Sequence, residues 1–441
     1  MSPAPARRRT ELGLIILAAL LTSGLYALAG LGKAGNLPAN IGPFLVIIFA
    51  LLVIAHLAMR RLAPNADPVL LPIAGLLNGI GYVFIARLSS HQARLQAVWT
   101  AIGIACFVLT LVLVRRARDL ERYRYSFAFA GIALLLLPLA PGIGENINGA
   151  RLWIHLGSFN FQPGEIAKLA LAIFFASVMV ERADLLGQGT RQVGRFLVLD
   201  PRYLAPILAA WGLSLVIFFA ENDLGSSFLF FALFIGMLWV ATGRAYYLGL
   251  GAVLFTAGSF IALKAIGHTK SRVHAWLNPW PHASTSGYQI IQGWFSIAAG
   301  GLFGEGPGQS NASHLPEAST DLIFAVIADE LGLIGASAVL FGFLLMVGTG
   351  LRVAVRCERQ FEKLLATGLS LIIGVQTFVI VGGVTRLIPL TGITLPFVSY
   401  GGSSLIANYI LLALLLRISH DTETVPAPAM TGPELAGLVQ G

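Results

Sequence analysis

Two carboxylates stand close together in residues 314–323, which read His-Leu-Pro-Glu-Ala-Ser-Thr-Asp-Leu-Ile. Glu317 and Asp321 come immediately before a long apolar run, residues 324–350. A carboxylate beside such a run is costly if the run lies in a membrane, so its presence suggests a function. A carboxylate placed there could act as a general base that takes a proton from a hydroxyl group.

A second group of charges lies in residues 162–168, Gln-Pro-Gly-Glu-Ile-Ala-Lys. The proline suits the start of a helix, which would place Glu165 and Lys168 on one face. A purely structural ion pair is one interpretation. The other is that Lys168, together with Arg151 just upstream, supplies positive charge for a phosphate-bearing ligand.

Two further polar segments have both a structural and a functional interpretation. Residues 221–223, Glu-Asn-Asp, separate two apolar runs, which requires a tight hairpin, and turn formation alone would explain Asp223. Residues 395–404, Leu-Pro-Phe-Val-Ser-Tyr-Gly-Gly-Ser-Ser, open the last apolar run. Close helix packing is the main alternative to a substrate contact by Ser399.

The glycine-rich segment 300–310 looks superficially like a phosphate-binding turn. A nucleotide site is excluded, because neither a strand nor a Lys-Ser/Thr pair follows the glycines. Backbone N–H groups offered to an anionic substrate and a plain re-entrant or hinge turn both remain open.

Composition indicates what must position these groups. Of the 441 residues 56% are hydrophobic and 11% are charged, with a mean hydropathy of +0.79. Such a chain is typical of an all-α polytopic membrane protein. The net charge of +8 does not indicate nucleic-acid binding, because the basic residues form short clusters between apolar runs.

A membrane-spanning helix needs about 20 mostly apolar residues. About twelve runs meet this requirement: 12–31, 41–59, 68–88, 95–114, 125–141, 166–180, 204–220, 224–241, 246–266, 322–347, 364–390 and 395–415.

Lys and Arg gather in alternate connections, and the positive-inside rule makes that side cytoplasmic. Both termini are then cytoplasmic, and the long connection 267–321 with its carboxylates is extracytoplasmic. The first run resembles a signal peptide but has no clear cleavage site, so we expect a retained helix. Cys106 and Cys357 have no disulfide or zinc spacing, and residues 418–441 are expected to be a disordered cytoplasmic tail.

These polar segments occur in one order and together resemble the SEDS family (shape, elongation, division and sporulation), the RodA and FtsW peptidoglycan glycosyltransferases. The resemblance runs from about residue 68 to 415. Its marks are residues 148–151 (Asn-Gly-Ala-Arg), 162–168, 223–225 (Asp-Leu-Gly), 300–304, 316–318 (Pro-Glu-Ala) with 320–321 (Thr-Asp), 330–332 (Glu-Leu-Gly) and 391–404.

The family usually spans the membrane ten times. The resemblance therefore implies that residues 1–67 are an amino-terminal addition of a tail and two helices, and that residues 68–417 are the glycosyltransferase core.

The resemblance implies polymerisation of lipid II, the undecaprenyl-pyrophosphate-linked disaccharide peptide, on the outer face of the bacterial cytoplasmic membrane. Asp321 matches the catalytic aspartate of the family. Cations would stabilise the pyrophosphate leaving group, and it stays open whether a divalent cation, Mg²⁺ or Mn²⁺, assists. The residues assigned to substrate binding are Arg151, Lys168, Glu165 (which holds Lys168), Asp223, Glu317 and Ser399.

Partners implied by the resemblance are lipid II, membrane lipids and a class B penicillin-binding protein, the transpeptidase that crosslinks the strands. The pattern favours the RodA-like elongation branch over an FtsW-like division polymerase. A lipid II flippase and a non-enzymatic scaffold remain as alternatives. The flippase is disfavoured because the charges gather near the outer edge, with only Asp329, Glu330 and Arg386 deeper in the apolar runs.

Overall fold

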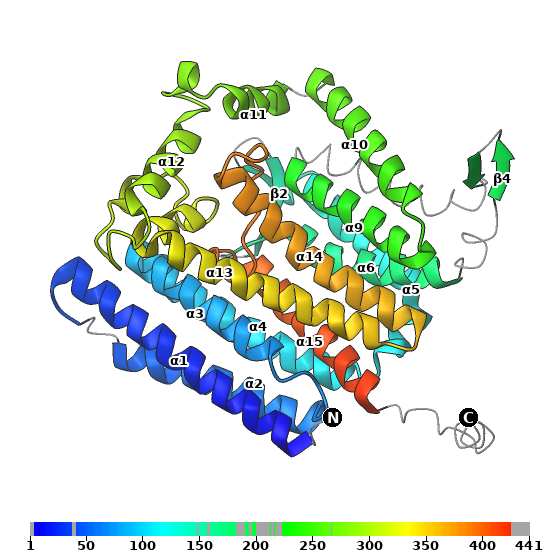
Figure 1. Cartoon of the computed structure of the whole chain (residues 1–441), viewed down its shortest axis with the longest axis horizontal. Coiled ribbons are helices and arrows are strands. Elements are labelled where there is room, and N and C mark those ends of the chain that lie inside the picture. The colour runs from blue at the N-terminus through cyan, green and yellow to red at the C-terminus, as the bar shows by residue number, and fades with distance from the viewer. Residues whose placement is uncertain are drawn as a thin grey trace, which may run out of the picture.

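The computed structural model describes residues 4–37, 41–147, 150–156, 159–181, 190–193, 196–199, 212, 216, 223–265 and 267–424 (Figure 1). Within these residues the chain forms thirteen α-helices, because in a bilayer a helix satisfies its own backbone hydrogen bonds. They are α1 (Ala4–Ala34), α2 (Ile41–Leu62), α3 (Leu70–Leu88), α4 (Ser90–Leu113), α5 (Arg124–Leu136), α6 (Pro163–Glu181), α9 (Leu224–Thr242), α10 (Tyr246–Ala265), α11 (Gly267–Leu277), α12 (Tyr288–Gly300), α13 (Ile323–Arg356), α14 (Gln360–Val384) and α15 (Gly402–Thr424).

Eight helices of the described residues are long and apolar enough to cross a membrane: α1, α3, α4, α6, α9, α13, α14 and α15. The prediction of a helical multi-pass membrane protein is confirmed. The predicted run at 204–220 lies outside the described residues except for positions 212 and 216.

The centre of the bundle is α15, which is almost entirely buried. It packs against α4, α6, α13 and α14. Its leucines, among them Leu411, Leu412 and Leu415, belong to the main hydrophobic core. The polar segments to be described therefore lie at the ends of helices that a well-packed core holds in place.

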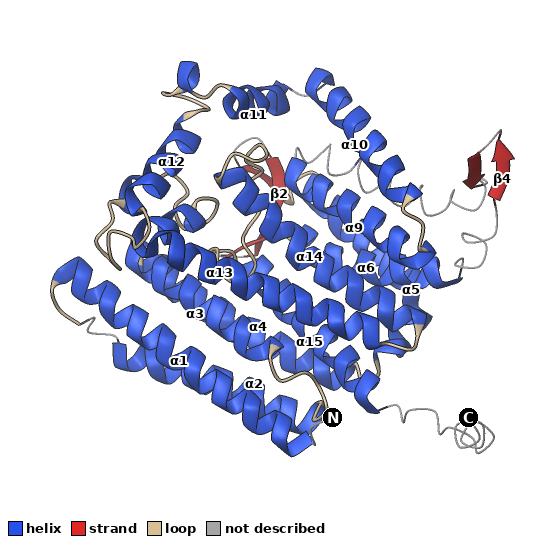
Figure 2. Cartoon of the chain, viewed as in Figure 1, coloured by secondary structure: helices blue, strands red, loops and turns tan. Residues whose placement is uncertain are grey.

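The all-α fold class holds for the membrane bundle, and two small antiparallel sheets lie in the connections (Figure 2). One contains β1 (Gly144–Ile147), β2 (Ala150–Leu156) and β3 (Phe159–Phe161), and the other β4 (Thr190–Val193) and β5 (Phe196–Leu199). In the first sheet Glu145 pairs with Trp153 and His155 with Asn160. The sequence Asn148-Gly149 between β1 and β2 is a strong hairpin signal, which a search for long apolar runs overlooks.

The last predicted run, 395–415, overlaps α15, but this helix begins and ends later in the sequence than we expected. Residues 395–401 are not helical, because Pro396 and two consecutive glycines disfavour a helix there, and α15 begins at Gly402. The helix then continues to Thr424, beyond residue 418, where we expected a disordered tail. Residues 425–441 of that predicted tail lie outside the described part of the chain.

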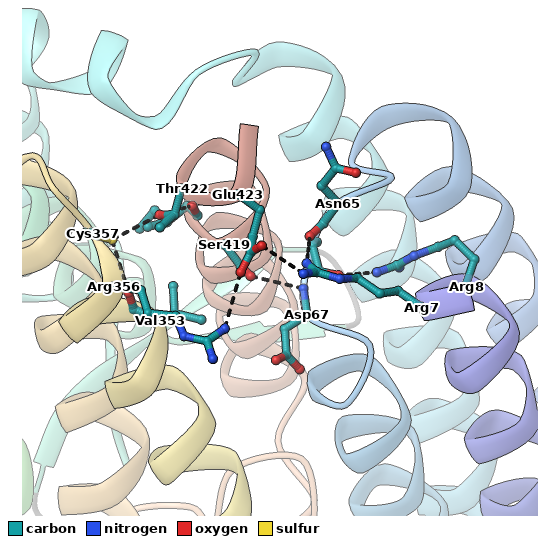
Figure 3. Close-up of polar contacts among 12 residues, drawn as sticks. Arg7, Arg8, Asn65, Asp67, Val353, Arg356, Cys357, Ser419, Thr422 and Glu423 are labelled. Carbon is teal, nitrogen blue, oxygen red and sulfur yellow. Dashed lines mark hydrogen bonds and ion pairs between the residues drawn. The ribbon is translucent and has the colours of Figure 1, made fainter. Parts of the chain in front are cut away.

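The amino-terminal helices are joined to the core at one end of the bundle (Figure 3). Arg7 of α1 donates to Glu423 at the end of α15 at 2.8 Å and to the carbonyl of Asn65 at 2.8 Å. Glu423 also accepts from Arg356 of α13 at 3.3 Å. The first turn of α1, the last turn of α13 and the last turn of α15 therefore lie on the same side of the molecule.

Candidate active site

The carboxylates at the start of α13 lie on a tight turn. Glu317 has a positive φ of 51°, and its carbonyl accepts from the backbone N–H groups of Thr320 and Leu322, both at 3.1 Å. Its side chain is exposed and accepts from the Thr320 hydroxyl at 3.0 Å. Asp321, half-buried, is presented at the end of this turn, directly before the helix.

The non-helical segment before α15 holds that turn in place. Ser399 Oγ donates to the Thr320 carbonyl at 2.7 Å and accepts from the Leu395 N–H at 2.9 Å. The Tyr400 N–H donates to the Ser319 carbonyl at 2.8 Å. The Ser399 side chain is 4% exposed, so in this structure its hydroxyl positions the turn that carries Asp321.

Arg272, on α11, brings positive charge to the same place and was missed by the sequence analysis. Its Nη1 donates to the Thr391 carbonyl at 2.8 Å. A Cβ on Gly392 would lie 3.7 Å from Asp321 Oδ2 and 3.8 Å from Arg272 Nη2, so the two side chains flank this glycine from close by. No local pattern marks Arg272, because α11 meets these residues only through the fold.

The ionisation of Asp321 is strongly perturbed. Its pKa is raised to about 7, first by burial and then by the negative charge of Glu317, while Arg272 acts in the opposite direction. A carboxyl group with such a pKa is half ionised near neutral pH, which suits a general base.

Asp223 also interacts electrostatically with Arg272. It caps α9, where its Oδ1 accepts from the Ser226 N–H at 3.0 Å, and it is 6% exposed. Burial raises the pKa of its carboxyl group, while Ser226, Arg272 and Lys168 act in the opposite direction. Arg272 is therefore electrostatically coupled to both Asp223 and Asp321. The neighbouring residues Glu221 and Asn222 of the predicted hairpin lie outside the described residues.

Glu165 and Lys168 form a buried ion pair on the first turns of α6. Lys168 Nζ donates to Glu165 Oε2 at 2.7 Å, and the side chains are 4% and 5% exposed, respectively. The Gln162 N–H at the start of this helix donates to Ser403 Oγ of α15 at 2.8 Å. The contact that was expected to hold Lys168 is present, and it uses one of the three donors of the ammonium group.

Arg151 is the assigned residue that the structure does not bring into this group. It lies on β2 and is exposed. Within the described residues it makes no hydrogen bond or ion pair with Lys168, Asp223 or Asp321.

The glycine-rich segment uses N–H groups for contacts within the protein, and one of them, that of Gly308, donates to Glu330 Oε2 at 2.7 Å. It packs against a break in α13 at Gly332, whose φ is 66°. The N–H groups of Glu305 and Gly306 donate to the carbonyls of Asp329 and Glu330 at 2.9 and 3.1 Å. These bonds satisfy the backbone groups that the break leaves free.

The deeper charges have structural partners. Glu330 forms an ion pair with Arg87 of α3 and accepts from Ser310 Oγ at 3.0 Å. Asp329 accepts from Ser296 Oγ at 2.6 Å. Arg386 was expected deep in an apolar run, but it follows the end of α14 and is exposed.

The donor set does not fit a metal ion held by the protein alone. Among the described residues no three His, Cys, Asp or Glu side chains gather closely enough to hold one. Glu317 and Asp321 could contribute two carboxylates, but Arg272 stands beside Asp321, and Mg²⁺ needs about six oxygen ligands. We therefore assign no step of a reaction to a metal.

Comparison with known proteins agrees with this arrangement. Residues 69–424 match the model of the FtsW, RodA and SpoVE family of cell cycle proteins. The chain belongs to this family. The predicted family membership is thus confirmed.

The relatives in this family include RodA proteins that match nearly the whole chain. The peptidoglycan glycosyltransferases RodA of Mycobacterium leprae and of Mycobacterium tuberculosis H37Rv are 43% and 42% identical to this chain, each over 95% of it and 92% of the relative. A probable peptidoglycan glycosyltransferase FtsW of Geobacter sp. M18 is 38% identical over 65% of this chain and 76% of its own length.

Solved structures of the family share the fold. The RodA of Thermus thermophilus superimposes with a TM-score of 0.58 at 27% identity, over 81% of this chain and 97% of that protein. A chain from a study of polymerisation and crosslinking by a peptidoglycan synthase complex superimposes with a TM-score of 0.67 at 25% identity, over 82% and 99%.

Proposed function

We propose that this chain is a peptidoglycan glycosyltransferase that polymerises lipid II into glycan strands on the outer face of the bacterial cytoplasmic membrane. The RodA relatives, which match 95% of the chain, support this enzyme class and favour the elongation branch. The observation that carries the proposal is Asp321, half-buried and with a pKa of about 7, between Glu317 and Arg272.

Asp321 is the general base in this proposal. It takes the proton from the acceptor sugar hydroxyl as the hydroxyl oxygen attacks the anomeric carbon of the donor. The bond from that carbon to the pyrophosphate oxygen breaks at the same time. Because a pyrophosphate is already a good leaving group, one carboxylate suffices, in contrast to the pair that glycosidases use.

Cations compensate the charge that develops on the pyrophosphate. Arg272 is placed for this role by its hydrogen bond to Thr391 and its proximity to Asp321. Lys168 contributes the positive charge of its ammonium group, and Arg151 on β2 is assigned to the phosphates from the sequence pattern alone. Asp223 holds Arg272 and Lys168 by charge, and Glu317 keeps the pKa of Asp321 high.

In this proposal the chain crosses the membrane about twelve times. Two of the spans precede the glycosyltransferase core, which begins at residue 68. The contact between Arg7 and Glu423 supports a location of both termini on one side of the membrane. The clusters of Lys and Arg make that side cytoplasmic. The connection 267–321, with α11 and α12, then lies outside together with Asp321.

A class B penicillin-binding protein is the partner in this proposal. Support comes from the similar chain described in a study of polymerisation and crosslinking by a peptidoglycan synthase complex. Two rival functions, lipid II transport and a non-enzymatic scaffold, differ from ours in that neither requires the purified protein to form polymer.

The test is a lipid II polymerisation assay on the purified chain, with and without the transpeptidase partner and a divalent cation. We expect Asp321→Asn, a nearly isosteric change, to reduce polymer formation by a factor of about 10² to 10⁴ without loss of folded protein. Glu305→Gln removes an exposed carboxylate on the same side and should retain activity. Normal glycan synthesis by Asp321→Asn would refute the assignment, and no polymer from the wild type would favour transport or a scaffold.

A further inference from the structure

A cavity of about 560 Å³ lies between α1, α3 and α4, apart from the residues of the proposed reaction. It lies at the C-terminal ends of α1 and α3, whereas the contact of Arg7 with Glu423 is at the N-terminal end of α1. Figure 1 shows α1 beside α3 at the edge of the molecule. Its volume is in the range of cavities that bind small organic molecules. Since α1 belongs to the amino-terminal addition, the cavity exists only because of that addition.

The inner wall of the cavity is apolar. Tyr26 and Ala29 of α1, Tyr82 and Val83 of α3, and Ala93 of α4 line it and form a separate buried hydrophobic cluster. The two tyrosine rings meet edge to face, with centroids 6.5 Å apart. A wall of this kind has few polar partners for ordered water, and it suits a hydrocarbon chain.

The mouth of the cavity is cationic. Lys33 and Arg94 line it and are exposed. Lys33 Nζ donates to the Arg87 carbonyl at 2.6 Å, whereas Arg94 makes no hydrogen bond or ion pair with another residue of the described chain. The charge of Arg87 itself is compensated by Glu330.

A phosphate group would complement these two cations. By the topology proposed above they lie on the outer side, where the positive-inside rule makes Lys and Arg uncommon. An apolar wall below two cations at the level of the headgroups matches the two parts of one anionic lipid.

We propose that this cavity binds an anionic phospholipid of the outer leaflet. An acyl chain packs along the wall formed by Tyr26 and Tyr82, and the headgroup phosphate contacts Lys33 and Arg94. The bound lipid fills the space between α1, α3 and α4. Next to this space α1 also contacts the glycine-rich segment, where a Cβ on Gly32 would meet the carbonyl of Pro307. The proposal rests on the topology above but not on the reaction.

Native mass spectrometry of the full chain in detergent tests this binding. The probes are phosphatidylglycerol and phosphatidylcholine with identical acyl chains. We expect phosphatidylglycerol to bind about thirtyfold more tightly, as two cations near an anionic headgroup imply. The double variant Lys33→Gln/Arg94→Gln should bind both lipids equally. Lys264→Gln, which removes an exposed cation of α10 outside the cavity, should keep the preference.

A second variant examines the apolar wall. Ala86→Leu extends into the cavity from α3 and should weaken the binding of both lipids by a similar factor. Equal binding by the wild type, or a preference that survives the double variant, would overturn the proposal. So would displacement of phosphatidylglycerol by an equal concentration of undecaprenyl phosphate, which would make the cavity a polyprenyl site.

The assay also separates this proposal from the proposed reaction. Binding is measured without turnover, so Asp321→Asn should bind phosphatidylglycerol as the wild type does. If polymerisation failed in every condition, the lipid preference would still be expected.

Discussion

Replacing Arg272 by glutamine tests whether its guanidinium group controls the ionisation of Asp321. From the two distances to a Cβ on Gly392, 3.7 and 3.8 Å, the charged atoms Asp321 Oδ2 and Arg272 Nη2 are at most about 7.5 Å apart, the sum of the two. With an effective dielectric constant of about 20, a pair of charges at this separation attracts by about 2.2 kcal/mol, equivalent to about 1.6 pKa units.

The sign of the effect follows from the charge. A nearby cation favours the ionised carboxylate, so loss of Arg272 raises the pKa of Asp321 above its value of about 7. The acid limb of the pH profile of kcat/KM should move to higher pH by about 1.6 units. At pH 7 the ionised fraction should fall about twentyfold, and this loss should be regained above about pH 9. The loss of the cation beside the pyrophosphate should add a further decrease in rate that does not depend on pH.

The measurement is the rate of lipid II polymerisation from about pH 6 to about pH 10, in the presence of the transpeptidase partner. Arg272→Lys keeps the charge and should leave the midpoint near that of the wild type. Lys270→Gln removes an exposed cation from the same helix and should change neither the midpoint nor the rate. If Arg272→Gln lowered the rate equally at every pH, Arg272 would act on the substrate alone, and the electrostatic argument would be wrong.

Two other changes test how the site is held. Ser399→Ala removes the hydroxyl that donates to the Thr320 carbonyl, so we expect kcat to fall about fivefold while KM stays unchanged. An unchanged kcat would mean that this hydroxyl does not position the turn that carries Asp321. Gly81→Ala puts a Cβ against the carbonyl of Val398 and should destabilise the protein by about 1 to 3 kcal/mol, which would lower the Tm measured in detergent. In the control Gly24→Ala the new Cβ meets no atom within 4 Å, so the Tm should not fall. Equal Tm values for the two variants would contradict the close packing of α3 against Val398.

The long helices could be predicted from the sequence because a bilayer admits few alternatives. The runs predicted at 68–88 and 246–266 correspond to α3 (Leu70–Leu88) and α10 (Tyr246–Ala265). A continuous apolar stretch in lipid must be a helix, since no water is present to satisfy the backbone otherwise. A search for apolar runs overlooked that Pro396 and the glycines disfavour a helix in residues 395–401. The hydrogen bonds from this segment to the Asp321 turn could not be predicted, because they join residues far apart in the sequence.

The candidate site was predictable only where its residues carry their own signal. Asp321 and Lys168 stand out as charges beside apolar runs. Arg272 does not, because it lies in a polar stretch of a long connection and becomes significant only when α11 folds back over Thr391. For the glycine-rich segment the sequence left two interpretations open, and the structure favours the turn, since a break in α13 accepts hydrogen bonds from its N–H groups.

The arrangement of charges also explains how one carboxylate can remain reactive at the edge of a membrane. Full burial without a counter-charge would keep Asp321 protonated, and a direct ion pair would lower its pKa and weaken it as a base. Arg272 provides the counter-charge without forming a direct ion pair with Asp321. It also interacts with Asp223 and donates to the Thr391 carbonyl, so it lowers the pKa of Asp321 only in part. A pKa near 7 is therefore a property of the whole group, and changing any one of its charges should move the pH at which the enzyme works.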